Sequence, residues 1–271
     1  MNRIIELNQN SIATMNGGTI TVENVPDAVL QGGENEFNNW SQGALDAKDL
    51  QTILGGGTPK SGRSYEDVTA SMTTNTGNTS YSVGLIDTIG PENITQLPLD
   101  TDKIPGLSGR SDADIAIAYQ RSLDLTSILG EALASASTTW GDKKSQEVAD
   151  KIVDSVNDKG HYGRITVLNA IMDGTDSDGD HVNDLKFGKN FLVDMAEGLE
   201  KIDYNAVSSY YSYLNSADPN IKSIGENYIG EYLKNQSHDP LAGVLSAMGN
   251  NSDAARIPPR RHHRSRHHTP I

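Results

Sequence analysis

The chain has 271 residues, a formal net charge of -14 at pH 7 and no cysteine. This length corresponds to one or two domains and is enough to bury a core. The acidic balance argues against nucleic-acid binding by the main body, because phosphate contacts need clustered Lys and Arg. The lack of cysteine excludes disulfides and thiolate metal sites. Because only 35% of residues are hydrophobic, we expect a modest core and long loops.

Residues 1–40 are polar and rich in Gly and Asn, and we expect an irregular, weakly ordered N-terminal arm there. Residues 19–22 alternate as a short strand does, but a lone strand cannot make a sheet. No ordinary signal peptide is predicted. No run of about 18 apolar residues indicates a membrane span. Localisation stays open between extracellular, reached by non-classical export, and cytoplasmic.

Helical patterning begins near Ser41 and ends at Gly55, with Leu50, Ile53 and Leu54 on one face. Ser64 is expected to start a second short helix. A third short helix is expected to stop at residues 90–91, which read Gly-Pro. Residues 98–110 hold two prolines and are predicted to be a connection.

The strongest helix pattern follows Ser111, which is a suitable N-cap. Apolar residues recur there at helical spacing, and the same spacing returns in three later segments. The four stripes are Leu125, Ile128, Leu129, Ala132, Leu133 and Ala136; Ala149, Ile152, Val153 and Val156; Leu192, Met195, Ala196 and Leu199; and Leu241, Val244, Leu245 and Met248. Narrow stripes on separate helices need one another for burial. We therefore predict a mainly α fold, an irregular helical bundle over residues 41–256.

Residues 257–271 are predicted to be a disordered, basic, Arg/His-rich tail. Arg256 to Ile271 hold five arginines, four of the seven histidines and no acid. Such a tail could bind nucleic acid, an anionic surface or a transition metal. It could equally result from a change of reading frame, so no function is built on it.

An aspartate-rich segment is the most specific short feature of the sequence. Alternating carboxylates around one point suit a hard cation such as Ca²⁺. The candidate ligands are Asp176, Asp178, Asp180, the backbone carbonyl of Val182, and Asp184. The segment resembles the calcium loop of thrombospondin type 3 repeats and of many bacterial surface proteins.

This calcium-loop pattern departs from the usual one at two positions. The sixth position, normally Gly, is His181, and the twelfth, normally a bidentate acid, is Phe187. Calcium binding and a solvated acidic loop between helices therefore both stay open.

Two other features have weaker functional interpretations. Residues 57–64 have P-loop spacing, but Arg63 replaces the lysine and a helical pattern precedes it, which favours a Gly-rich linker. A group of tyrosines could form a recognition surface or edge a small core; its members are Tyr204, Tyr210, Tyr211, Tyr213, Tyr228 and Tyr232. We find no set of nucleophile, base and oxyanion groups.

A longer order of motifs is similar to an uncharacterised helical family of actinobacterial proteins, over about residues 43–256. The motifs are residues 89–93 (IGPEN), 127–137 (SILGEALASAS) with Trp140, 191–200 (FLVDMAEGLE) and 239–251 (DPLAGVLSAMGNN). Members of that family often accompany type VII secretion substrates and polymorphic toxins. Trp40 and Trp140 do not form the Trp-x-Gly turn of those substrates. The resemblance implies a chain that is a fragment of a longer protein, and it supplies no catalytic residues.

We therefore expect a non-enzymatic helical interaction or scaffold module that accompanies or carries exported actinobacterial toxins. Its expected partners are proteins or missing parts of a longer chain. One alternative is a calcium-dependent extracellular module that uses the 176–184 loop, with Ca²⁺ as its cofactor. Another is an unrecognised hydrolase or toxin. Loss of a calcium response on replacing Asp176 and Asp178, or toxicity on expression, would separate these alternatives.

Overall fold

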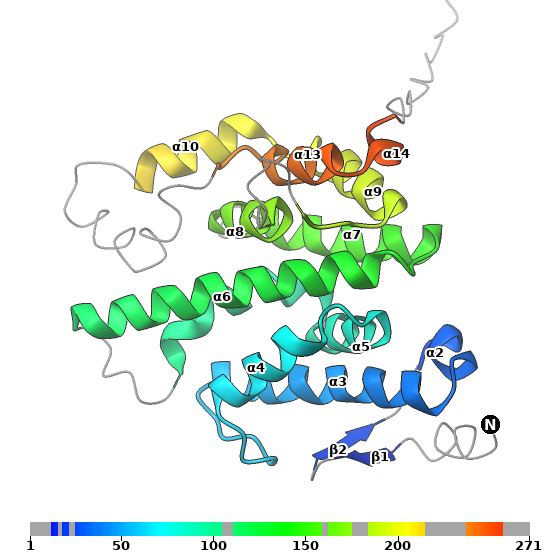
Figure 1. Cartoon of the computed structure of the whole chain (residues 1–271). Helices are drawn as coiled ribbons and strands as arrows, with labels where there is room; N and C mark the ends of the chain where they lie inside the picture. Colours follow the sequence, from blue (N-terminus) through cyan, green and yellow to red (C-terminus); the bar gives the residue numbers. More distant parts are fainter. Residues whose placement is uncertain are drawn as a thin grey trace, which may run out of the picture.

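The computed structural model describes residues 12–15, 18–21, 25–104, 111–158, 162–174, 184–214 and 237–256. The fold is mainly helical, as the sequence predicted (Figure 1). The elements in chain order are β1 (Ile12–Met15), β2 (Gly18–Thr21), α2 (Asp27–Gln31), α3 (Glu34–Leu54), α4 (Tyr65–Asn75), α5 (Thr79–Ile89), the 3-10 helices η1 (Pro91–Asn93) and η2 (Leu97–Lys103), α6 (Asp112–Ser137), α7 (Asp142–Val156), α8 (Gly163–Asp173), α9 (Lys189–Leu199), α10 (Tyr204–Leu214), α13 (Ala242–Gly249) and α14 (Ser252–Ala255).

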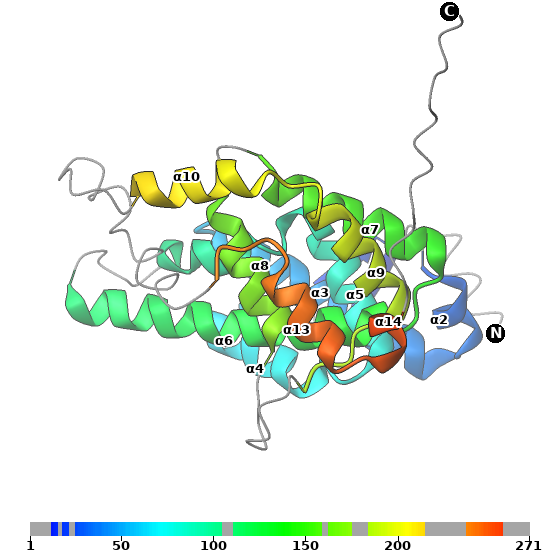
Figure 2. The same ribbon diagram turned by 90° about the horizontal axis from the view of Figure 1, so that it is seen from above.

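Helix α6 lies in the middle of the bundle. Figure 1 shows α3, α4 and α5 on one side of it and α7 to α10 with α13 on the other. Seen from above in Figure 2, α13 lies across α8 and α9. The predicted stripe of α6 is buried, with Leu125, Leu129 and Leu133 fully inside one continuous core. The stripes predicted on α7 and α9 join this core, because each is too narrow to be buried alone. The prediction of the fourth stripe is only partly right, since Val244 is buried on α13 but Leu245 is 57% exposed.

The N-terminal region contains more structure than the sequence indicated. The strand indicated near residues 19–22 is present as β2, but the expectation that it has no partner is wrong, because β2 pairs with β1 in an antiparallel hairpin that matches Ile12 with Thr21. The helical part also begins before residue 41, since α2 and the start of α3 precede it. Val29, Phe37 and Trp40 are buried in the core. The polar composition concealed these few anchoring side chains.

Local capping fixes several helix ends where the sequence placed them. The Ser64 hydroxyl accepts from the Asp67 amide, and the Asp67 carboxylate accepts from the Ser64 amide, which completes a capping box. Ser111 caps α6 by accepting from the Asp114 amide. Gly90 ends α5 with φ 81°, a conformation that glycine adopts without strain. The connection predicted at 98–110 begins as η2, while residues 105–110 lie outside the described residues.

Two glycines allow α3 and α5 to pack backbone against backbone. A Cβ atom on Gly84 would overlap the Trp40 carbonyl oxygen, and one on Gly43 would overlap the Tyr81 carbonyl oxygen. Glycine inside a helix costs roughly 0.5–1 kcal/mol relative to alanine. The close approach of two helices is the physical reason for these positions. It brings α3 and α5 together beside the pocket described below.

Three asparagines hold the C-terminal segment on the bundle. The Asn169 amide on α8 donates to the carbonyls of Ser237 and Asp239, and its oxygen accepts from the Gly243 amide at 3.0 Å. Asn250 and Asn251 donate to the carbonyls of two residues that follow the aspartate-rich loop. The predicted tail at 257–271 lies outside the described residues. Over the described part of the chain, no helix has the length and apolar character that crossing a membrane requires.

Candidate functional site

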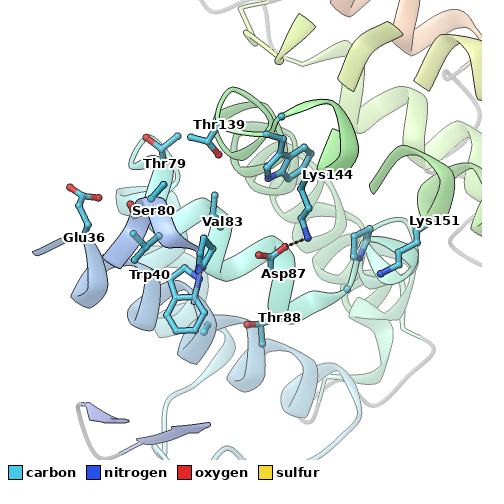
Figure 3. Close-up of a pocket in the computed structure, with 18 of the residues that line it drawn as sticks. Glu36, Trp40, Thr79, Ser80, Val83, Asp87, Thr88, Thr139, Lys144 and Lys151 are labelled. Atoms are coloured by element: carbon cyan, nitrogen blue, oxygen red, sulfur yellow. Dashed lines mark ion pairs between the residues drawn. The ribbon is translucent and has the colours of Figure 1, made fainter. Parts of the chain in front are cut away.

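A pocket with a volume of about 800 Å³ opens between α2, α3, α5 and the start of α7. Figure 3 shows most of the side chains that line it. They come from segments that are far apart in the sequence. Helix α3 contributes a stripe of one residue per turn, Glu36, Trp40, Ala44 and Lys48. Helix α5 contributes a second stripe that includes Val83 and Asp87. The volume lies within the range of about 300–1,000 Å³ that ligand pockets in proteins occupy.

Both tryptophans of the chain line this pocket. Trp40 is 5% exposed and Trp140 is 9% exposed, and neither indole N–H has a hydrogen-bond acceptor. Trp40 stacks on Phe37 at a centroid distance of 6.2 Å, and Trp140 contacts Phe191 edge to face at 5.4 Å. Both rings therefore pack on an aromatic neighbour at the edge of the core.

The charged groups of the pocket are balanced. Three lysines (Lys48, Lys144, Lys151) and three acids (Glu36, Asp87, Glu92) line it. Lys144 Nζ forms an ion pair with Asp87 Oδ1 at 2.9 Å, drawn as a dashed line in Figure 3. Lys151 also pairs at 3.1 Å with Glu147, where the hydrogen bond from Lys151 and the charge of Lys144 lower the pKa of Glu147. The pocket therefore has no strong charge of either sign.

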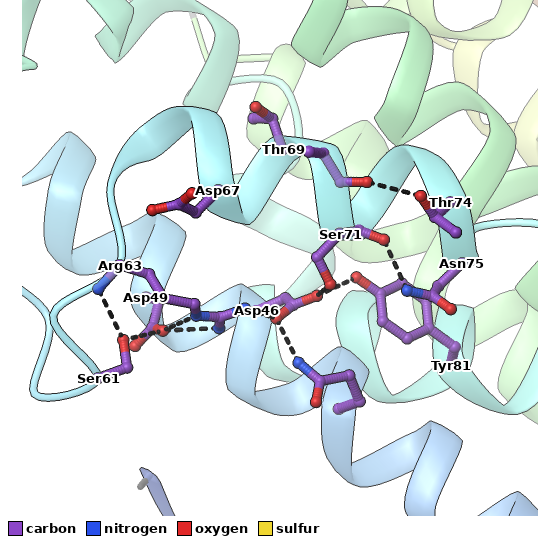
Figure 4. A network of polar contacts seen from close by, with 12 residues as sticks. Asp46, Asp49, Ser61, Arg63, Asp67, Thr69, Ser71, Thr74, Asn75 and Tyr81 are labelled. Carbon is purple, nitrogen blue, oxygen red and sulfur yellow. Dashed lines mark hydrogen bonds and ion pairs between the residues drawn. The ribbon is translucent and has the colours of Figure 1, made fainter. Parts of the chain in front are cut away.

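A second cluster is a buried polar network around Asp46, shown in Figure 4. The Asp46 carboxylate is 0% exposed and accepts four hydrogen bonds. Oδ1 accepts from Gln42 Nε2 at 2.7 Å and Arg63 Nη1 at 2.6 Å. Oδ2 accepts from Ser71 Oγ at 2.6 Å and the Tyr81 hydroxyl at 2.5 Å. All the oxygen lone pairs have partners, as a buried carboxylate requires.

Arg63 links this carboxylate to a second one. Its Nε and Nη2 donate to Asp49 Oδ2 at 2.9 and 2.7 Å, while Nη1 donates to Asp46. Burial lowers the pKa of Arg63, but the hydrogen bonds and charges of Asp46 and Asp49 outweigh it, so the pKa is raised. Burial beside Asp46 also raises the pKa of Tyr81. The network thus holds the loop between α3 and α4 against α3.

This arrangement gives the P-loop-like segment a structural role. Arg63, which stands where a P-loop has its lysine, points to two carboxylates of its own chain. The segment follows a helix, α3, and not a strand. A phosphate would have to compete with both Asp46 and Asp49 for the guanidinium. The interpretation as a linker that is fixed to the helix therefore agrees with the structure.

The proposed calcium ligands cannot be placed together. Four of them lie outside the described residues: Asp176, Asp178, Asp180 and Val182. Asp184 is the first described residue after this segment, and it is exposed. In the ranges that the structure describes, no group of three or more His, Asp or Glu side chains could hold a metal ion. Calcium binding therefore stays a prediction from the sequence.

Part of the tyrosine group packs at the edge of the core. Tyr211 stacks on His238 at 4.9 Å, and its hydroxyl donates to the Tyr162 carbonyl at 3.0 Å. Burial raises the pKa of Tyr211 to about 12. Tyr204 and Tyr213 are 50% and 54% exposed. Tyr228 and Tyr232 lie outside the described residues. The described members fit a core edge with two open rings better than a single recognition surface.

Fold and pocket together define an irregular bundle of helices with a ligand-sized opening. The chain belongs to a family of unknown function, DUF6571, whose model matches residues 1–257. No curated protein and no solved structure matches the chain. The matched residues include the β1–β2 hairpin and every helix described above.

Sequence reasoning did not find the two clusters described above. The tryptophans are 100 residues apart, and no spacing rule joins them. The helical period of Glu36, Trp40, Ala44 and Lys48 could have indicated one mixed stripe on α3. For the polar network, the available signal was a pair of acids inside a helical pattern, Asp46 and Asp49, followed by a loop that carries one arginine.

Proposed function

We propose that this chain is a non-enzymatic helical binding module that accompanies or carries exported toxins of actinobacteria. The observation that carries the proposal is the pocket of about 800 Å³ lined by both tryptophans. Tryptophans in a well-packed, concave site are characteristic of residues that dominate binding energy in protein interfaces. The module would hold its partner at this opening in the bundle.

The buried carboxylate of Asp46 and the pocket carboxylate of Asp87 are already paired within the chain, which supports a binding function over a catalytic one. The most deeply buried carboxylate, Asp46, accepts four hydrogen bonds from its own chain. Its partner Arg63 is shared between two carboxylates. Such groups stabilise the loop after α3 and have no free lone pair or proton to offer a substrate. Asp87 in the pocket is paired with Lys144.

The toxin and type VII secretion part of the proposal rests on the order of the sequence motifs alone. It is tested by expressing the tagged full chain in an actinobacterial host with an active type VII pathway. We expect capture of an exported toxin, identified by mass spectrometry, and recovery of both proteins from the medium. A monomer that captures no toxin, or an activity that cleaves substrate by itself, would refute the proposal.

A calcium-dependent module is the second proposal, and the anchoring of the loop ends favours it. Gly174, with φ 66°, ends α8 before the aspartate-rich segment. After that segment, Leu185 and Phe187 are buried, and Asn250 and Asn251 donate to their carbonyls at 3.0 and 2.9 Å. Fixed ends reduce the entropy cost of closing a loop around an ion. Ca²⁺ held by the 176–184 segment would then tie α8 to the C-terminal segment.

A further inference from the structure

The indole N–H groups of the two tryptophans that line the pocket have no hydrogen-bond acceptor. Trp40 and Trp140 are each at least nine-tenths buried and have no acceptor. A buried donor without a partner lowers the stability of the fold, and most such groups in folded proteins are satisfied. Among the described residues, four other buried polar side-chain atoms also lack a partner, on Ser41, Thr95, Arg121 and Ser145, and none of these residues lines the pocket. The two indole donors are the pair that occurs in the walls of one pocket, where a ligand could supply acceptors.

Both N–H groups are covered in the free chain, which has a measurable consequence. An acceptor can reach them only if the indole rings shift when the ligand binds. These are the two tryptophans of the whole chain, and both line the pocket, so intrinsic tryptophan emission is a probe of ligand binding there.

Burial of the rings also limits the kind of ligand. Sugars and nucleobases bind aromatic side chains by stacking on an open ring face. At 5% and 9% exposure, Trp40 and Trp140 do not offer open faces. Beside them the pocket wall has the apolar side chains of Val29, Ala44 and Val83. The ligand therefore needs acceptors combined with small apolar groups.

The charge and shape of the pocket restrict the ligand further. Three lysines are matched by three acids, and Lys144 is paired with Asp87 at 2.9 Å, so neither a phosphate-rich nor a strongly basic ligand is favoured. The α3 stripe from Glu36 to Lys48 is about 18 Å long at 1.5 Å per residue. An extended polypeptide of about six residues has this length.

We infer that the pocket binds an extended, uncharged polypeptide segment of a partner protein, whose backbone carbonyls accept from the two indole N–H groups. This inference rests on the proposed binding function and names its site and the chemistry of the segment. Backbone carbonyls recur along such a segment, and its small apolar side chains fit against α3 and α5.

The test is a titration of the full chain with pools of blocked hexapeptides, acetylated and amidated at their ends, monitored by tryptophan emission. One pool contains Ala, Val, Leu, Ser, Thr and Gly, and two matched pools carry Lys or Glu at two positions. We expect the neutral pool to produce a saturable change in emission. No change with the neutral pool up to about 1 mM peptide would overturn the inference, as would a response to the charged pools alone.

Pocket variants show where the peptide binds. Thr88 is half-buried in the pocket wall, so Thr88→Arg should weaken binding of the neutral pool by about tenfold or more. Thr73→Arg on the exposed face of α4 is the matched control and should bind as the unaltered chain does. Ser80→Arg is a second blocking variant if the melting temperature shows that Thr88→Arg does not fold. Equal binding by a folded blocking variant and the control would overturn the assignment.

Failure of the inference can be distinguished from failure of the proposed function. If the chain captures an exported toxin but neutral peptides leave the emission unchanged, the binding module stands and the pocket assignment falls. If peptides bind in the pocket and no toxin is captured, the pocket assignment stands and the toxin role falls. A soluble oligosaccharide that changes the emission when peptides do not would identify a different ligand class and overturn the inference.

Discussion

The guanidinium of Arg63 lies 2.6 Å from the carboxylate of Asp46, which is fully buried on α3. The same side chain also pairs with Asp49 at 2.7 Å. One cation thus compensates two carboxylates inside the fold and closes the loop that joins α3 to α4. Buried pairs of this kind are sensitive to the loss of one partner, because the remaining charge is left without compensation.

Replacing Arg63 with Met should therefore destabilise the chain by about 3–5 kcal/mol. The measurement is the free energy of unfolding in urea. Lys60→Met, in the same loop but exposed, is the matched control and should change stability by less than about 0.5 kcal/mol. Equal effects of the two substitutions would show that the network around Asp46 does not stabilise the fold.

Asn169→Ala should release the C-terminal segment from α8. The substitution removes two donated hydrogen bonds and one accepted from Gly243, so we expect a loss of roughly 1–3 kcal/mol. Hydrogen exchange of the amides in α13 should become faster than in the rest of the bundle. Asn205→Ala, at an exposed position of α10, serves as control and should leave exchange in α13 as it is.

Tyr211 should contribute a loss of stability at alkaline pH. Its pKa rises from 10.0 to about 12 in the folded chain because of burial. The folded state therefore holds the proton more tightly, so the contribution is complete below pH 10 and declines as pH rises from 10 to 12. The difference in unfolding free energy between the unaltered chain and Tyr211→Phe should shrink over this window by up to about 2–3 kcal/mol. A difference that is constant from pH 9 to pH 12 would contradict this assignment.

Calcium should raise the melting temperature if the 176–184 segment binds it. With about 1 mM Ca²⁺ and a Kd near ~10 μM, the folded state gains about 2.7 kcal/mol. This corresponds to several degrees, at roughly 2–4 °C per kcal/mol for a chain of this size. We expect the rise in the unaltered chain and its absence after Asp176→Asn with Asp178→Asn. Identical melts in Ca²⁺ and in excess chelator would reduce the segment to a solvated connection.

The helical part of the fold follows from local signals in the sequence. The stripe with Leu125, Leu129 and Leu133 predicted α6, and Ser64 and Ser111 predicted the starts of α4 and α6. These signals are readable because helical period and capping act over a few residues.

The pairing of distant residues could not be predicted in the same way. The strand at residues 19–22 pairs with β1. Residues 12–15 are too few to show a clear alternation of apolar and polar side chains, so the sequence did not indicate this partner strand. The contact between α3 and α5 at Gly43 and Gly84 depends on how two helices cross. Trp40 and Trp140 line one pocket only because the whole bundle brings α3 and the start of α7 together. Tertiary packing decides each of these relationships, and it leaves little trace at neighbouring positions.

The most direct test of the proposed binding function is capture of an exported toxin by the tagged full chain and by its pocket variants in an actinobacterial host. The account predicts that the unaltered chain and Thr73→Arg retain the toxin equally, while folded Thr88→Arg retains at most about a tenth as much. Equal recovery with all three chains, or recovery of no toxin with any of them, would contradict a binding module that uses this pocket.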